Sequence, residues 1–191
     1  MNDYSDSSLG PIGAADRNLL VAIAQYYHSP AVLEYGSAEG HSARAWLDGG
    51  ARLVHCVDVW CSSPMENVIA NNSDRVTFYG IDQTAFRPQA SYNIIFMDAS
   101  HHLETNIVTI QAAQDAIVEG GCLVIHDTGK WAAESMTDAH RAFGGHTDTD
   151  GGKWHQPGEV EFVKWLRGQG WNCVNLASTT ALRHGITLCQ A

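Results

Sequence analysis

AVLEYGSAEG, the stretch at residues 31–40, decides the fold of this chain. Apolar residues lead into Glu34, and glycines follow at positions 36 and 40, just before a helical pattern at 40–48. A second apolar run at 53–59 completes a strand–helix–strand unit. Glycines in the turn allow the backbone to approach a ligand closely. The stretch therefore predicts a parallel sheet with a ligand loop at the end of its first strand.

The same alternation of strand and helix continues along the chain. Helices are predicted at 14–28, 40–48, 103–120, 132–143 and 159–167. Strands are predicted at 31–35, 53–59, 75–80, 92–98, 122–126, 172–176 and 186–189. This order favours a doubly wound sheet with helices on both faces, closed by a C-terminal antiparallel hairpin. We expect a single α/β domain over 1–191, with a Rossmann-like, seven-stranded, mostly parallel sheet and a flexible N-terminus at 1–13.

The composition excludes several classes of partner. The formal net charge is −10, and the 11 lysine and arginine residues are spread singly, so no basic stripe could neutralise a nucleic acid. No apolar run has the length of a membrane span, and the polar start is unlike a signal peptide. We expect a cytoplasmic protein with no nucleic-acid or membrane partner. The five cysteines, an odd number without CxxC spacing, are expected to be reduced thiols.

Acidic and imidazole side chains follow the predicted strands, at the edge where an open α/β sheet binds its ligands. Glu34 ends the first strand, Asp58 the second and Asp98 the fourth, shortly before His101 and His102. The turn after the first strand lacks the middle glycine of the dinucleotide fingerprint, and a carboxylate there would repel a pyrophosphate. Asp58 is placed to accept both hydroxyls of a ribose. The pattern predicts a nucleoside cofactor beside a catalytic or metal-binding group.

Four features together resemble the class I S-adenosylmethionine-dependent methyltransferases. They are ExGxxxG at 34–40, Asp58, DASHHLE at 98–104 and GGCLVIHD at 120–127. Within that class they are most similar to the small-molecule O-methyltransferases related to macrocin O-methyltransferase. The resemblance covers about residues 14–129. It implies an enzyme that moves a methyl group from S-adenosylmethionine to a hydroxyl of a small-molecule acceptor, such as a sugar or a natural product.

The resemblance also implies roles for individual residues. The cofactor would be bordered by Glu34, Gly36, Ser37, Gly40, Asp58, Val59, Ile81, Asp82, Gln83 and Asp98. A divalent cation, magnesium or manganese, would be held by Asp98, His126 and Asp127. The catalytic residues would be His101, as the base, and Asp98.

The residue types suit this chemistry. An alcohol hydroxyl is a weak acid that needs a base, and preferably a cation, to attack a methyl group. The two carboxylates suit magnesium, whereas His126 suits manganese, iron or zinc at least as well, or lies beside the ion without binding it. The alternatives are that Asp98 and Asp127 only cap the helices after them, and that His101 bonds to a neighbouring backbone group.

The segment 128–158 follows the fifth strand and is expected to bind the acceptor and cover the site through its aromatic and imidazole residues. The alternative is that its tryptophans only anchor the loop. The chain departs from the family pattern at Ala99, Leu103 and Thr109. The family pattern therefore does not predict which neighbouring residues support the site. A homodimer is expected to complete the pocket.

Three other functions stay open as alternatives. The acceptor atom could be a nitrogen of a small molecule. The fold could bind a different nucleotide, as an NAD-type oxidoreductase does, although the missing middle glycine counts against this. The chain could also be a non-catalytic partner protein that keeps the cofactor pocket.

Overall fold

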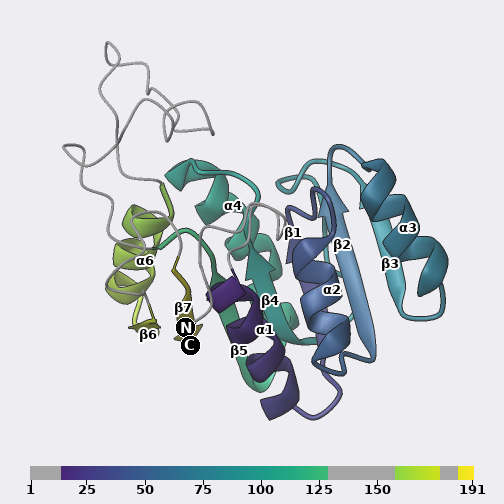
Figure 1. Cartoon of the computed structure of the whole chain (residues 1–191). Helices are drawn as coiled ribbons and strands as arrows, with labels where there is room; N and C mark the ends of the chain where they lie inside the picture. Colours follow the sequence, from purple (N-terminus) through teal and green to yellow (C-terminus); the bar gives the residue numbers. More distant parts are fainter. Residues whose placement is uncertain (1–13, 129–157, 177–184) are drawn as a thin grey trace, which may run out of the picture.

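A computed structural model describes residues 14–128, 158–176 and 185–191. Within them, one seven-stranded sheet has the strand order β3-β2-β1-β4-β5-β7-β6 (Figure 1). The strands are β1 (Ala31–Tyr35), β2 (Leu53–Asp58), β3 (Val76–Gly80), β4 (Tyr92–Met97), β5 (Ile117–Ile125), β6 (Asn172–Asn175) and β7 (Thr187–Gln190). The first five strands pair in parallel, and β7 pairs antiparallel with both β5 and β6. The predicted single-domain α/β fold with a closing hairpin is confirmed.

Helices cover both faces of this sheet. They are α1 (Ala14–Tyr26), α2 (His41–Asp48), α3 (Ser63–Asn71), α4 (Leu103–Ala113) and α6 (Gly158–Gly168), with a short 3-10 helix η2 at Gln114–Ala116. The side chains of β1 alternate between two cores: Val32 packs with α1, α2 and α3, whereas Leu33 and Tyr35 pack with α4 and α6. Figure 1 shows α1 and α2 side by side on one face. Burial on both faces explains why these strands are almost continuously apolar in sequence.

The strand order reverses between β1 and β4. From β1 the chain moves outward to β2 and β3, then returns to place β4 on the other side of β1. In an open parallel sheet, such a reversal leaves a crevice outside the carboxyl ends of the two central strands. The turns that follow β1 and β4 lie at this crevice, which is where the sequence predicts its functional residues.

The first helix is shorter than predicted. α1 ends at Tyr26, and the chain then turns through His28 and Ser29, whose φ angles are 49° and 71°. Left-handed backbone cannot continue a right-handed helix, so the helix cannot reach residue 28.

The helix predicted at 103–120 also ends early. Ile117, expected on its buried face, begins β5 and pairs with Tyr92 in β4. A β-branched residue such as isoleucine suits a strand as well as a helix face, so periodicity alone misassigns it. α3 is absent from the prediction, although Ser62 caps it by accepting a hydrogen bond from the Met65 N–H at 3.2 Å.

The closing hairpin contains a disulfide between Cys173 and Cys189. The two residues are directly opposite in the antiparallel pair of β6 and β7, and their Cα atoms are 4.1 Å apart. The expectation that all five thiols are reduced is therefore wrong for this pair, because strand register decides which cysteines meet. Cys56, Cys61 and Cys122 are free.

Several expectations fall outside the described residues. They concern the N-terminus at 1–13, the helix at 132–143 and the segment 128–158 apart from its two end residues. Among the helices that the structure describes, none combines the length and the apolar character needed to cross a membrane.

Candidate functional site

The turns after β1 and β4 touch each other. The N–H of Gly36 donates to the carbonyl of Val57 at 2.9 Å, and the N–H of Asp98 donates to the carbonyl of Tyr35 at 2.9 Å. Gly36 has a φ of 87°, and a Cβ atom there would lie 2.6 Å from Cα of Ala99 and closer still to the carbonyl oxygen of Asp98. Only glycine fits this position. The predicted ligand loop therefore lies directly against the backbone of Asp98.

Asp58, at the end of β2, binds the same turn. Its Oδ2 accepts hydrogen bonds from the N–H groups of Ser37 and Ala38, both at 2.9 Å, and its Oδ1 accepts from the N–H of Trp60 at 3.2 Å. The side chain is partly exposed. Because a carboxylate offers about four acceptor sites, Asp58 keeps capacity for a ligand hydroxyl while it holds the turn.

Glu34 lies beneath the turn. It is fully buried, and its Oε2 accepts a hydrogen bond from Nε1 of Trp46 in α2 at 2.9 Å. Burial raises the pKa of Glu34 to about 8, against the opposing effect of the Ser42, Trp46 and Ser37 hydrogen-bond donors. The structure therefore shows Glu34 as a buried link between β1 and α2, and its contact with a cofactor stays a prediction.

Ser37 and Gly40, the other predicted residues of the turn, are also enclosed. Ser37 is buried. Gly40 has a φ of 76°, and a Cβ atom there would lie 2.9 Å from Sδ of Met65 in α3. The left-handed backbone and the close approach of Met65 both favour glycine at position 40, and its contact with a cofactor stays a prediction.

Exposed apolar side chains mark the carboxyl ends of β2 and β3. Val59 is 73% exposed and Ile81 is 39% exposed. Asp58 and Gly80, which precede them, are opposite each other in the parallel pair, so Val59 and Ile81 leave the sheet from adjacent strands. Apolar surface of this kind suits a flat aromatic ring. Asp82, the next predicted residue, is exposed and accepts a hydrogen bond from the N–H of Thr84 at 2.8 Å.

Gln83, predicted near adenine, is buried and supports the turn after β4. Its Nε2 donates to Oγ1 of Thr109 at 2.7 Å, and its Oε1 accepts from the N–H of Ser100 at 3.1 Å. Thr109, one of the departures from the family pattern, is therefore the partner that lets Gln83 connect this turn to α4.

Asp98, His126 and Asp127 form a compact cluster at the carboxyl ends of β4 and β5. Nδ1 of His126 lies 3.2 Å from Oδ1 of Asp98 and 3.5 Å from Oδ1 of Asp127. One possible ligand atom from each residue lies within 4.8 Å of the others. His126 and Asp127 are buried, whereas Asp98 is partly exposed. The structure thus brings the three predicted metal ligands together.

A further acid, Asp16 of α1, joins this cluster. Its Oδ2 lies 3.1 Å from Nε2 of His126, and its side chain is buried. Burial alone would lower the pKa of His126, but the carboxylates of Asp98, Asp127 and Asp16 raise it well above its usual value. Sequence reasoning missed Asp16, because an acid in the first turn of a helix is explained by the macrodipole alone and its partner is 110 positions away.

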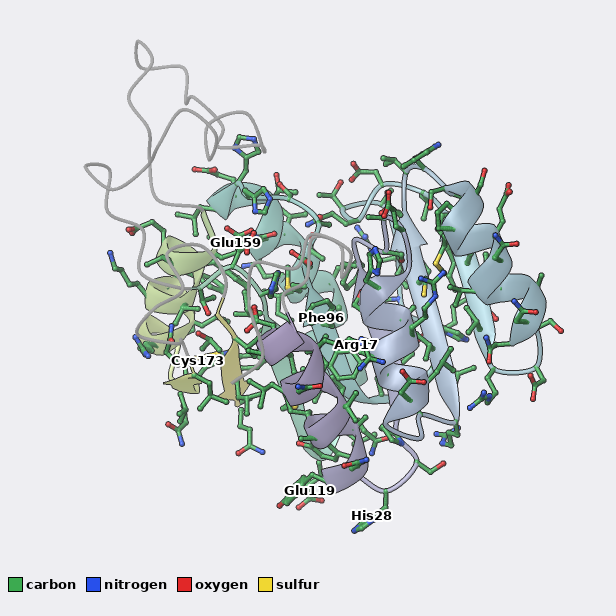
Figure 2. All side chains as sticks on the ribbon, viewed as in Figure 1. Arg17, His28, Phe96, Glu119, Glu159 and Cys173 are labelled. Carbon is green, nitrogen blue, oxygen red and sulfur yellow. A yellow bond between two sulfur atoms is a disulfide. The ribbon has the colours of Figure 1, made fainter. Side chains whose placement is uncertain are left out.

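His101 pairs with a buried acid from α6. Its Nδ1 lies 2.5 Å from Oε1 of Glu159. Glu159, labelled in Figure 2, is at the start of that helix. Burial alone would lower the pKa of His101, but the hydrogen bond and charge of Glu159, with smaller effects of Asp127 and Asp98, raise it above its usual value. Burial also raises the pKa of Glu159.

The two adjacent histidines are therefore divided between the interior and the surface. His101 is partly buried, whereas His102 is exposed and precedes α4 as its N-cap residue. Glu159 is the second functional candidate that sequence reasoning missed. Acids in the first turn of a helix, such as Glu159 and Glu161 in α6, are sufficiently explained by the helix macrodipole, so the sequence gives no sign of a distant partner.

The protein has an open α/β sheet, and acidic and imidazole groups lie at the edge where such sheets bind their ligands. A family model described as a methyltransferase domain matches residues 33–128. The chain belongs to this methyltransferase family. The matched stretch contains the glycine turn, Asp58, His101 and the acid–imidazole cluster, whereas Asp16 and Glu159 lie outside it.

Solved structures share the fold. The methyltransferase PaMTH1 of Podospora anserina, with bound SAH, is 16% identical, with 98% of this chain and 82% of that chain covered and a TM-score of 0.68. An O-methyltransferase family protein from Burkholderia thailandensis is 13% identical, with 91% and 54% covered and a TM-score of 0.65. The 1,6-didemethyltoxoflavin-N1-methyltransferase of the same organism is 13% identical, with 97% and 79% covered and a TM-score of 0.63. No curated protein sequence matches the chain.

Proposed function

We propose that this methyltransferase moves a methyl group from S-adenosylmethionine to a hydroxyl oxygen of a small molecule, as the macrocin O-methyltransferase-like enzymes do. The observation that carries the proposal is the contact between the turn at Gly36 and the backbone of Asp98. It supports an arrangement in which a cofactor loop and the acid–imidazole cluster would border the two sides of one crevice. A methyl donor bound by the first would present its methyl group to an acceptor held at the second.

The cofactor side has a polar part and an apolar part. Asp58 would accept the ribose hydroxyls with the capacity left beside its bonds to Ser37 and Ala38. Val59 and Ile81 would cover the adenine, because they are exposed at adjacent strand ends. Negative charge at Asp58 and Asp98 also suits a sulfonium, which carries a positive charge.

The acceptor side supplies a base. The pairing of His101 Nδ1 with Glu159 orients the imidazole and makes it a stronger base toward the acceptor hydroxyl. As the acceptor oxygen forms its bond to the methyl carbon, the carbon–sulfur bond breaks and its electron pair stays on sulfur, which releases S-adenosylhomocysteine. His101 would take the hydroxyl proton. Because Glu159 raises the pKa of His101, transfer should become faster as the pH rises through that pKa and the imidazole becomes neutral.

The cluster of Asp98, His126 and Asp127 fits a divalent cation. Ligand atoms that share one ion at about 2.1 Å are roughly 3.0–3.4 Å apart. The distance from His126 Nδ1 to Asp98, 3.2 Å, is inside that range, and the distance to Asp127, 3.5 Å, is just beyond it. A bound cation would stabilise the alkoxide form of the acceptor. Asp98, the partly exposed member, would then border both the ion and the acceptor.

Calorimetric titration with S-adenosylmethionine and S-adenosylhomocysteine tests the proposal. We expect micromolar binding to the wild type and at least a 100-fold loss in Asp58→Ala, because hydrogen bonds to a charged group contribute about 1.5–3 kcal/mol each. Asp74→Ala, which removes an exposed acid elsewhere, is the control and should bind as the wild type does. Absence of binding to the folded wild type would refute the proposal.

The acceptor atom is tested separately. Panels of small alcohols, sugars, phenols and amines are incubated with labelled S-adenosylmethionine, and the products are separated. Methylation of hydroxyls that disappears in His101→Ala supports transfer to oxygen. Methylation confined to amines would refute it and would assign the enzyme to nitrogen.

A further inference from the structure

The imidazole of His126 is held between carboxylates on both of its nitrogens. Nε2 faces Asp16 at 3.1 Å, while Nδ1 faces Asp98 at 3.2 Å and Asp127 at 3.5 Å. Asp16 comes from α1, whereas the other two acids follow β4 and β5. The two sides of the ring therefore have different surroundings: one acid on one side, and the two predicted metal ligands on the other.

We propose that Asp16 is a positioning residue that fixes His126 with its proton on Nε2. Nδ1 of His126 then binds a divalent cation that Asp98 and Asp127 also bind. This cation is a transition metal such as Mn²⁺ or Co²⁺ in preference to Mg²⁺. The proposal rests on the metal-assisted form of the proposed function. It adds the residue that orients the nitrogen ligand and the class of ion that this ligand selects.

The first step concerns the orientation of the ring. Carboxylates favour a proton on both ring nitrogens, and a cation bound at Nδ1 would replace the proton there; the remaining N–H would then lie on Nε2, where the Asp16 carboxylate can only accept it. A ring that binds a metal through one nitrogen commonly donates its other N–H to a carboxylate, which fixes both its tautomer and its angle. Asp16 and His126 are both buried, so this contact is shielded from competing water.

The second step concerns the rigidity of the cluster. The N–H of His126 donates to the carbonyl of Met97 at 3.1 Å, and the N–H of Thr128 donates to the carbonyl of Gly185 at 3.2 Å. Oγ1 of Thr187 in β7 donates to Oγ1 of Thr128 at 2.9 Å. The segment that carries His126 and Asp127 is thus fixed by β4 on one side and by the chain around β7 on the other.

The third step concerns the ion. Mg²⁺ prefers oxygen ligands and retains several waters, whereas an imidazole in the ligand set favours first-row transition metals. A set of one nitrogen and two carboxylates therefore distinguishes these ions. Asp16 strengthens the distinction because an N–H bound to a carboxylate makes the ring a better donor to the metal.

Metal titration tests the proposal without any activity measurement. Metal-free protein is titrated with Mn²⁺, Co²⁺ and Mg²⁺ by calorimetry, and the visible absorption of bound Co²⁺ reports the donor set. We expect Mn²⁺ and Co²⁺ to bind at least 10-fold more tightly than Mg²⁺. Asp16→Ala should weaken the binding of Mn²⁺ and of Co²⁺ by roughly 10- to 100-fold. Asp16→Asn should lose less metal affinity, because its amide oxygen still accepts from Nε2–H. His126→Asp, an all-oxygen set, should reduce the preference for Mn²⁺ over Mg²⁺.

Two controls keep the outcomes separate. Asp115→Asn removes an exposed acid before β5, at the opposite edge of the sheet, and should leave metal affinity unchanged. Binding of S-adenosylhomocysteine is measured in every variant. If the wild type binds this ligand but no ion, the metal proposal is wrong while the proposed cofactor survives. If Asp16→Ala binds ions as tightly as the wild type, the role of Asp16 is overturned. If Mg²⁺ binds most tightly, the choice of ion is overturned.

Discussion

Glu159 Oε1 lies 2.5 Å from Nδ1 of His101, and the two residues are 58 positions apart in the chain. Glu159 begins α6, whereas His101 is in the turn after β4, so the pair connects the hairpin side of the molecule with the central crevice. A buried carboxylate at this distance raises the pKa of the imidazole and fixes its orientation.

Glu159→Gln should lower the pKa of His101, because the amide can still occupy the space but has no negative charge. The pKa is measured by NMR titration of histidine side chains, with His101→Gln to assign the resonance. Glu161→Gln is the matched control, because Glu161 is in the same turn of α6 but is exposed and paired with Lys164 at 2.7 Å. An unchanged His101 pKa in Glu159→Gln would show that the pair does not govern this histidine.

Gly36→Ala should destabilise the site more than a backbone penalty alone. Gly36 and Gly50 have similar φ angles of 87° and 90°, but an added Cβ meets the backbone of Asp98 at the first position and nothing within 4 Å at the second. Gly50→Ala should therefore cost only about 1–2 kcal/mol of stability for its left-handed backbone. Gly36→Ala should cost more and also weaken S-adenosylhomocysteine binding at least 10-fold. Equal losses in stability and binding for the two variants would contradict this.

Glu34→Gln should change how stability depends on pH. In the folded protein the pKa of Glu34 is raised to about 8 from the ordinary 4.5, mainly by burial. Between these values the folded state holds a proton that the unfolded chain releases, so stability falls as the pH rises, at most by roughly 1.4 kcal/mol per pH unit. Denaturant unfolding at pH 5 and pH 8 should show a smaller decline in Glu34→Gln. The exposed Glu66→Gln should keep the decline of the wild type, and an equal decline in both variants would exclude Glu34 as its source.

Cys173→Ser should lower the free energy of unfolding by about 3 kcal/mol, the value for a closed loop of roughly 15 residues, since the bridged cysteines are 16 positions apart. Cys61→Ser, at a free and partly exposed thiol, is the control. Thiol titration of the unreduced, denatured wild type should find three reactive groups, because Cys56, Cys61 and Cys122 are free. Five reactive thiols would show that the protein carries no disulfide.

Local patterns predicted much of the fold and the outline of the site. The apolar run 31–35 is β1 in the structure, and Asp127 lies beyond the end of β5 as predicted, whereas His126, predicted as the last residue of that strand, directly follows it. These residues could be found because hydrophobic period and strand ends are properties of neighbouring positions. Periodicity failed at Ile117, where a helix face and a strand have the same short apolar pattern.

The missed features all depend on pairing between distant segments. Asp16 and Glu159 are ordinary first-turn acids until the structure places them against His126 and His101. The disulfide depends on the register of β6 and β7, which no local pattern reports. The hydrogen bond from the N–H of Ser100 to Gln83 was also not foreseen, and the predicted place of Gln83 near adenine stays a prediction.

The acids at positions 16 and 159 lie before the first strand and after the fifth, outside the span that carries the recognisable motifs. Each contacts one of the two histidines in the crevice. Related chains can therefore keep every motif of the central sheet and still differ in how strongly their imidazoles bind protons or ions. Divergence of chemistry in this fold would then begin at its outer helices, and a shortened chain that spans only β1 to β5 would retain the motifs without the two acids that adjust the histidines.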